Sequence, residues 1–272
     1  MVPTTEQIAH KARVSSLNMI STAKAAHLGS SLSVIDILAV LYGEIAKISK
    51  NEPDGITSDQ VIVSKGHAAA GTYSVLAHSG FLDTSVLDTY CADGSILGGH
   101  VTSGKVAGVP LSTGSLGHGL PFGIGLALAR KKANSNAFVY VVMSDGECDE
   151  GTTWESALIA SQFELSNLIV LIDRNRHQSF GDTESTISLE PFQEKWAAFN
   201  WDVFTVDGHD HNELKVSLAS ARENKSKNPT LIICNTIKGK GISFMEDQVV
   251  WHYRPPTAEQ LESALHELGD FS

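Results

Sequence analysis

Two short apolar runs, at residues 137–143 (AFVYVVM) and 168–172 (LIVLI), constrain the fold more than any other feature of the chain. Both runs are rich in β-branched residues and are bounded by turn formers, which is typical of strands that are buried on both faces. The residues between them, 152–163, have a helical pattern. This arrangement predicts two parallel strands of one sheet, joined by a helix.

Polar side chains follow each of these predicted strands. The first run leads into SDGECDEG at 144–151 and the second into DRNRH at 173–177. Because the carboxyl ends of neighbouring parallel strands open onto one crevice, we expect Asp145 and Asn175 to lie side by side. Such a pair of oxygen side chains suits Mg²⁺, which fills its other positions with water or phosphate oxygens. Either piece alone is more simply an ordinary turn at a strand end, but both pieces on consecutive strands favour a metal site.

The rest of the chain alternates between helical and strand patterns, which predicts an α/β fold with a mostly parallel sheet and helices on both of its faces. We expect a small-residue turn at 25–31, followed by a helix that Ser33 could cap. The patterns predict helices at residues 5–24, 33–42, 69–79, 85–91, 119–132, 152–163, 191–200, 213–224 and within the tail, 242–272, and strands at 59–63, 137–143, 168–172, 201–206 and 230–234. No repeat or linker interrupts this alternation, so we expect a single domain over residues 1–272.

Three early histidines fall in the predicted connections between elements. His27 lies in the first turn, His67 at a strand-to-helix turn, and His100 in a Gly-rich loop, 93–119, which is long for a compact domain. Glycines in that loop permit a ligand to approach the backbone closely. A lone loop histidine is usually only solvated, so the placement of these residues in turns, rather than their number, indicates a function.

Charge and cysteine usage exclude several classes of partner. A net charge of −11 and a pI near 5.4 argue against nucleic acid or an anionic membrane. Any phosphate must therefore be held locally, by helix N-termini, backbone amides and a metal. Cys91, Cys148 and Cys234 have no paired spacing, and no charged and then apolar leader precedes the first helix, so we expect a reduced, cytoplasmic protein. The longest apolar stretches look strand-sized, which is too short to span a bilayer.

Several short motifs occur in a fixed order along the chain: SKGH at 64–67, GGH at 98–100, STGSLG at 112–117, DG at 145–146, EG at 150–151, Asn175, DGH at 207–209 and KGKG at 238–241. In this order they resemble the landmarks of the transketolase family of thiamine diphosphate enzymes, and specifically the amino-terminal domain of transketolase. The resemblance covers nearly the whole chain. It implies a fold that binds thiamine diphosphate together with Mg²⁺, for which Ca²⁺ or Mn²⁺ could substitute.

Carried over by position, the resemblance implies a metal bound by Asp145, Asn175 and the backbone carbonyl of His177. It also implies cofactor contacts from the glycine-rich motifs and the tail, namely His67, Gly114, Ser115, Leu116, Gly146, Glu147, Glu150, Asn175 and His252. The implied catalytic residues are four histidines, His27, His67, His100 and His252. Attack on a ketose or aldose carbonyl requires protons to move on and off hydroxyl groups, and imidazoles titrate near neutral pH.

Three positions depart from the family pattern. Ser144 replaces the first Gly of Gly-Asp-Gly, Arg174 replaces an Asp or Asn before the second metal ligand, and Tyr253 follows His252 where relatives usually have Gly. Ser144 is small enough to be tolerated. Arg174 is expected to pair with Asp173 or a neighbouring acid, and Tyr253 leaves the place of His252 in the site open.

The resemblance also implies a missing part. Full-length transketolases continue into a second domain, whose Glu protonates the cofactor's aminopyrimidine ring, and the motifs of this chain supply no such Glu. We therefore expect the amino-terminal subunit of a split transketolase, which moves a two-carbon ketol unit from a ketose or its phosphate to an aldose. It would act only with a carboxyl-terminal partner subunit that carries the pyrimidine-binding domain, in an α2β2 assembly.

Two alternatives remain. The first is the α subunit of a 2-oxo acid dehydrogenase, although such subunits lack the early histidines. The second is a non-catalytic, regulatory relative that binds the cofactor, which the retained metal ligands and histidines disfavour. The donor and acceptor sugars are not readable, because the family's phosphate-binding arginines lie in the missing domains.

Overall fold

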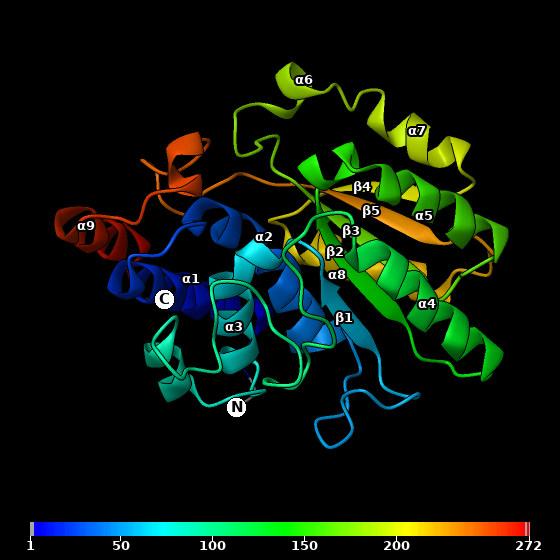
Figure 1. The fold of residues 1–272 in the computed structure, drawn as a ribbon, viewed down its shortest axis with the longest axis horizontal. Coiled ribbons are helices and arrows are strands. Elements are labelled where there is room, and N and C mark those ends of the chain that lie inside the picture. The colour runs from blue at the N-terminus through cyan, green and yellow to red at the C-terminus, as the bar shows by residue number, and fades with distance from the viewer. Residues whose placement is uncertain (1–2, 270, 272) are drawn as a thin grey trace.

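A five-stranded sheet lies at the centre of the computed structural model, which describes residues 3–269 and 271. The strands are β1 (Gln60–Val63), β2 (Val139–Ser144), β3 (Leu168–Arg174), β4 (Asp202–Asp207) and β5 (Thr230–Asn235). They are all parallel and follow the order β1-β2-β3-β5-β4. Helices cover both faces of the sheet (Figure 1), which confirms the fold class predicted from the sequence.

The helices correspond closely to those predicted. They are α1 (Thr5–Ala23), α2 (Leu28–Val40), α3 (Ala69–His78), α4 (Gly119–Lys132), α5 (Gly151–Gln162), α6 (Thr183–Thr186), α7 (Phe192–Ala198), α8 (His211–Glu223) and α9 (Ala258–Leu268). Shorter helical turns are the π-helical η1 (Leu41–Ile45) and the 3₁₀ turns η2 (Gly66–Ala68), η3 (Thr84–Thr89), η4 (Gly146–Asp149) and η5 (Val249–His252). The sequence did not predict α6, and the α-helix predicted at 85–91 is instead η3. Residues 270 and 272 of the predicted tail segment lie outside the described residues.

Alternate residues of the central strands contribute to two separate cores. Every residue of β2 is buried. Val139 and Val141 pack with residues of α4, α5 and α7, whereas Tyr140 and Val142 pack on the opposite face with α1, α2 and α3. Since successive side chains of a strand point to opposite faces, a continuous apolar run is what a sheet covered on both sides requires.

Helix α2 begins at Leu28 rather than at Ser33, so part of the predicted turn at 25–31 is helical. This first part of α2 packs closely against α3. At Gly71 of α3, a Cβ atom would lie only 2.7 Å from the carbonyl oxygen of Ser31, so small residues allow the two helices to approach. Ser33 is consequently an interior residue and not a cap, and its hydroxyl donates a hydrogen bond to Asp173 over 2.6 Å.

Residues 28–45, which comprise α2 and η1, form an apolar stretch longer than the strand-sized apolar runs expected from the sequence. Its length and its mean hydropathy of 1.5 would allow it to cross a membrane by composition alone. However, 83% of it is buried inside the fold, and the buried core helix of a globular protein has the same composition.

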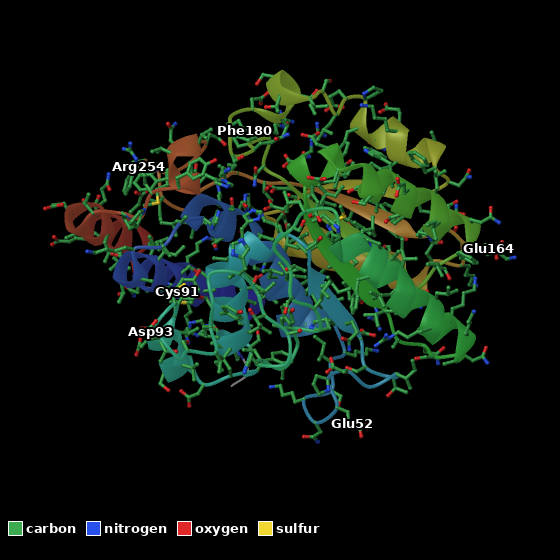
Figure 2. The ribbon with its side chains drawn as sticks, in the orientation of Figure 1. Glu52, Cys91, Asp93, Glu164, Phe180 and Arg254 are labelled. Carbon is green, nitrogen blue, oxygen red and sulfur yellow. The ribbon has the colours of Figure 1, made fainter. Side chains whose placement is uncertain are left out.

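The two ends of the parallel strands lead into different connections. Figure 2 shows Phe180 on the connection that follows β3 and Glu164 on the turn that precedes it, toward opposite ends of the strands. Strands β2 and β3 are paired as far as Ser144 and Asp173. The carboxyl ends of β2 and β3 therefore lie next to each other, at the end of the sheet where the Phe180 connection begins.

Candidate active site

Asp145 and Asn175 lie at the neighbouring carboxyl ends of β2 and β3, as predicted. Both side chains are buried, with 1% and 4% of their surface exposed. The Asp145 carboxylate accepts hydrogen bonds from the backbone N–H groups of Gly146 (2.8 Å) and Arg176 (2.6 Å), so it connects the two strand ends directly. The amide oxygen of Asn175 accepts one from the N–H of His177 over 3.1 Å.

These strand ends open onto a cavity of about 210 Å³. Its lining combines predicted residues from several distant segments, namely His27, His67, His100, Gly114, Leu116, Ser144, Asp145, Gly146, Asn175, His177 and His252. The fold therefore brings together all four predicted catalytic histidines and all three predicted metal-ligand residues.

Three residues predicted to contact the cofactor do not line this cavity. Ser115 and Glu150 are exposed, and Glu150 precedes α5 at its N-cap position. Glu147 is fully buried, and its carboxylate accepts hydrogen bonds from the Ser64 hydroxyl and from the N–H of Gly117 over 2.8 Å. This buried carboxylate thus connects η4 to β1 and to the Gly-rich loop, and burial raises its pKa.

The four histidines form one cluster, although they come from four separate segments. The ring centroid of His27 lies 5.3 Å from that of His67, 5.7 Å from that of His100 and 5.0 Å from that of His252. His27 has a left-handed backbone conformation (φ 72°) just before α2, and its N–H donates to the carbonyl of His252 over 2.9 Å. The first inter-helix connection is thereby fastened to the tail.

Burial makes the imidazoles of His27, His67 and His252 weak bases. It lowers the pKa of His27 to about 4 and that of His252 to about 3, and the positive charge of Lys238 lowers both further. The pKa of His67 also lies well below its ordinary value, because of burial and the charge of Lys65. These rings are therefore neutral near pH 7, with one nitrogen able to donate a proton and the other able to accept one.

The sequence motifs contained two lysines to which no role was given. Lys65, in SKGH, lines the cavity, and its ammonium forms a fully buried ion pair with Asp173. Lys238, in KGKG, lies behind the wall of the cavity and is also fully buried. Ser30, Gln178 and Ser179 line the cavity as well, and no sequence pattern pointed to them.

The positions that depart from the family pattern have clear places in the structure. Ser144 fits at the end of β2 with 8% of its surface exposed. Arg174 pairs with Glu190 and not with Asp173. His252 lines the cavity, while the exposed ring of Tyr253 packs edge-on against it at 4.9 Å between centroids.

The donor set of the cavity fits a hard divalent cation. Among the residues that the structure describes, no three His, Cys, Asp or Glu side chains form a metal cluster. The cavity instead offers the carboxylate of Asp145 and the amide oxygens of Asn175 and Gln178, a sparse oxygen set of the kind that Mg²⁺ accepts. Burial, and secondly the charge of Asp173, raise the pKa of Asp145 to about 6. A cation beside Asp145 would oppose both effects and stabilise its charged form.

Comparison with known proteins agrees with this geometry. Residues 4–270 match the family model described as "Transketolase, thiamine diphosphate binding domain". The chain is 39% identical over 269 residues to a protein of Phocaeicola vulgatus that is named as one subunit of an apulose-4-phosphate transketolase, covering 99% of this chain and 95% of that relative. It is 37% identical to a 6-deoxy-6-sulfo-D-fructose transketolase subunit of a Clostridium species, covering 89% of this chain and 88% of that relative. The chain belongs to the transketolase family.

Solved structures support the same family. The transketolase of Campylobacter jejuni has a TM-score of 0.89 and 29% identity, and that of Leishmania mexicana has a TM-score of 0.90 and 27% identity. These matches cover 97% and 98% of this chain but only 42% of each solved chain. Human transketolase is 33% identical, and this chain spans 41% of its length. The chain thus corresponds to about two fifths of a single-chain transketolase.

Proposed function

We propose that this chain is the thiamine diphosphate-binding, amino-terminal subunit of a two-chain transketolase. The complete enzyme transfers a two-carbon ketol unit from a ketose or ketose phosphate to an aldose. The observation that carries the proposal is that the Asp145–Asn175 pair and four imidazoles meet in one cavity. Relatives that this chain covers almost completely are themselves named as transketolase subunits, which supports a two-chain enzyme.

Asp145, Asn175 and the backbone carbonyl of His177 would hold a divalent cation, which is Mg²⁺ by preference, with Ca²⁺ or Mn²⁺ as substitutes. Gly146 lines the cavity, where the diphosphate would lie, and a Cβ there would lie 3.0 Å from Cγ of Gln178, so a glycine allows the two segments to approach. When bound, thiamine diphosphate supplies the nucleophilic carbon that attacks the ketose carbonyl.

The histidines of the cavity move protons on the sugar hydroxyl groups. His27, His100 and His252 face the substrate, and His67 lies beside the cofactor, in agreement with the shared cavity. The lowered pKa values of His27, His67 and His252 keep these three uncharged at neutral pH. His27 and His67 can then accept a proton, whereas Nδ1 of His252 already accepts a hydrogen bond from Lys238 (3.1 Å), so this ring donates through Nε2.

A partner must supply the acid that protonates the cofactor's aminopyrimidine ring. Among the described residues that line the cavity, the carboxylate is Asp145, which the cation occupies. Glu147 is bound to Ser64 and Gly117 and does not reach the cavity lining. Glu150 is exposed four residues after Gly146 of the cavity lining, where a partner would cover it.

An apolar surface on α4 and α5 suits this partner. Phe122 on α4, Leu158 and Ile159 on α5, and Phe163 directly after α5 are large apolar side chains with 39–57% of their surface exposed. Both helices begin beside cavity segments, since α4 follows the Gly-rich loop and α5 follows η4. Leu158, Ile159 and Phe163 lie toward the end of α5 that leads to Glu164, so a partner seated here would have to cover the length of α5 to reach the cavity. Exposed apolar surface of this kind is typical of a protein–protein interface.

Two copies of each chain then form an α2β2 enzyme, which we place in the cytoplasm because all three cysteines are free thiols. The test is an assay of ketol transfer from sugars and sugar phosphates to aldehydes, with this chain alone, the neighbouring gene product alone, and both together. Activity is expected only in the mixture and only with thiamine diphosphate and Mg²⁺. Turnover by the isolated chain would disprove the split enzyme. Cofactor binding without turnover in the mixture would instead support a non-catalytic relative.

A further inference from the structure

A buried carboxylate outside the cavity binds three basic side chains at once. Asp36, on α2, is 4% exposed and accepts hydrogen bonds from Arg13, from Nδ1 of His209 (2.7 Å) and from Nε2 of His211 (2.9 Å). Burial alone would raise the pKa of Asp36, but the charge of Arg13 and the hydrogen bonds from the two histidines hold it below its ordinary value. Asp36 is therefore a charged group inside the fold, with defined partners.

Two of these partners, His209 and Arg13, also form hydrogen bonds to the backbone of one segment, residues 237–240. Nε2 of His209 accepts a hydrogen bond from the N–H of Ile237 over 2.9 Å. The proton of a neutral His209 must then lie on Nδ1, from which it is donated to Asp36. On the other side, Nε of Arg13 donates to the carbonyl of Lys240 over 3.3 Å. One carboxylate thus orients both groups that hold the two ends of the segment.

Lys238 lies between these two hydrogen-bonded positions, Ile237 and Lys240, and its side chain is directed toward the active site. Its Nζ donates to Nδ1 of His252 (3.1 Å) and to the backbone carbonyls of His177 (3.3 Å) and Gln178 (3.4 Å). With Nδ1 of His252 acting as acceptor, the proton of the neutral ring is on Nε2. Lys238 therefore sets both the tautomer of His252 and the position of two carbonyls in the cavity wall.

We propose that Asp36, together with Arg13 and His209, is a positioning clamp that places Lys238 and, through it, His252 and the 177–178 backbone. The clamp acts on the active site without touching it. Its effect on cofactor binding depends on the function proposed above, whereas its effect on His252 does not.

The chain contains a matched control for this clamp. His211 binds the same carboxylate, but its other ring nitrogen pairs with the hydroxyl of Thr5 on α1 over 2.8 Å, and not with the 237–240 segment. His209 and His211 are both largely buried, with 12% and 8% of their side chains exposed. Loss of either removes one hydrogen bond to Asp36, but only the loss of His209 releases Ile237.

The experiment compares H209A, D36N and H211A in the full chain. Ring ¹⁵N chemical shifts, measured by NMR, report which nitrogen of His252 is protonated. Calorimetry with the partner present gives the dissociation constant for thiamine diphosphate with Mg²⁺. We expect H209A and D36N to lose the Nε2–H preference of His252 and to weaken cofactor binding by about tenfold or more, as is typical when groups that orient site residues are lost. H211A should leave both quantities unchanged, even if its melting temperature falls as far.

An unchanged His252 tautomer in folded H209A would overturn the clamp, and this variant decides the matter if D36N does not fold. An equal change in H211A would also overturn it, because the effect would then reflect general destabilisation. If the tautomer responds as expected but the parent protein binds no thiamine diphosphate, the clamp stands and the proposed function fails.

Discussion

Lys65 and Asp173 form an ion pair in which both side chains are completely buried beside the cavity. Asp173 also accepts hydrogen bonds from the hydroxyls of Ser33 (2.6 Å) and Thr236. One carboxylate therefore joins β1, α2 and β5 at the point where β3 ends. Its charge also contributes to the raised pKa of Asp145. The Lys65–Asp173 pair therefore affects both the stability of the fold at the carboxyl ends of the strands and the electrostatics of the site.

Removing one member of this pair should destabilise the fold strongly. We expect Asp173→Ala to lower the free energy of unfolding by about 3–5 kcal/mol, because the Lys65 ammonium would stay buried without a counter-ion. Urea denaturation measures the loss. The double variant Lys65→Met/Asp173→Leu should recover much of it, and a double variant less stable than D173A would contradict this account.

Asp145→Ala should abolish metal-dependent cofactor binding. A diphosphate and an acidic protein repel each other unless a cation lies between them, and Asp145 is the charged side chain of the proposed metal site. Calorimetry with thiamine diphosphate and Mg²⁺, with the partner present, gives the dissociation constant. Asp93→Ala is the control, since Asp93 is exposed and lies well away from the Phe180 connection (Figure 2). Equal affinity in D145A and the parent would show that the metal is placed wrongly.

Replacing His100 by Ala should lower turnover but not stability. His100 lies in the Gly-rich loop with an exposed side chain, so its loss leaves no cavity in the core. We expect a fall in kcat of about 10²-fold or more with a melting temperature within a few degrees of the parent. His67→Ala should behave similarly in turnover. A large fall in the melting temperature of either variant would indicate a structural role for that histidine.

Two helical glycines should respond to alanine in opposite directions. At Gly71 of α3, a Cβ would meet the Ser31 carbonyl at 2.7 Å, so Gly71→Ala should cost about 1–3 kcal/mol through overpacking. At Gly125 of α4, no heavy atom among the described residues lies within 4 Å of such a Cβ, so Gly125→Ala should raise the free energy of unfolding by up to about 1 kcal/mol. Chemical denaturation of the isolated chain compares them. A neutral Gly71→Ala would show that α2 and α3 can move apart at no cost.

The histidine cluster should make stability fall in mild acid. The pKa of His27 is about 4 in the fold against an ordinary value of 6.5, so below pH 6.5 the unfolded chain binds more protons than the folded one. This contribution is complete above pH 6.5 and is lost as the pH falls toward 4. The melting temperature of His27→Gln should therefore fall less than that of the parent between pH 7 and pH 5. Asp145, whose pKa is raised, acts in the opposite direction in both proteins and cancels in the comparison. Parallel curves would contradict the shifted pKa.

The local sequence pattern was sufficient to predict the central strands of the sheet and the pairing of Asp145 with Asn175. The runs at 137–143 and 168–172 predicted strands covered on both faces, because both are short, apolar and rich in β-branched residues. Once both runs are parallel neighbours, Asp145 and Asn175 must meet, since each directly follows or closely follows the end of its strand. The family motifs then pointed to His27, His67, His100 and His252.

Contacts between distant segments decided the rest. The close approach of α2 and α3 depends on Gly71, and the burial of Glu147 depends on donors from Ser64, directly after β1, and from the Gly-rich loop. Asp36 and His209 are 173 positions apart in the chain, and neither lies in a pattern that predicts the other. Periodicity records only which face of an element is apolar, whereas a buried charge is placed by partners that come together only when the elements pack.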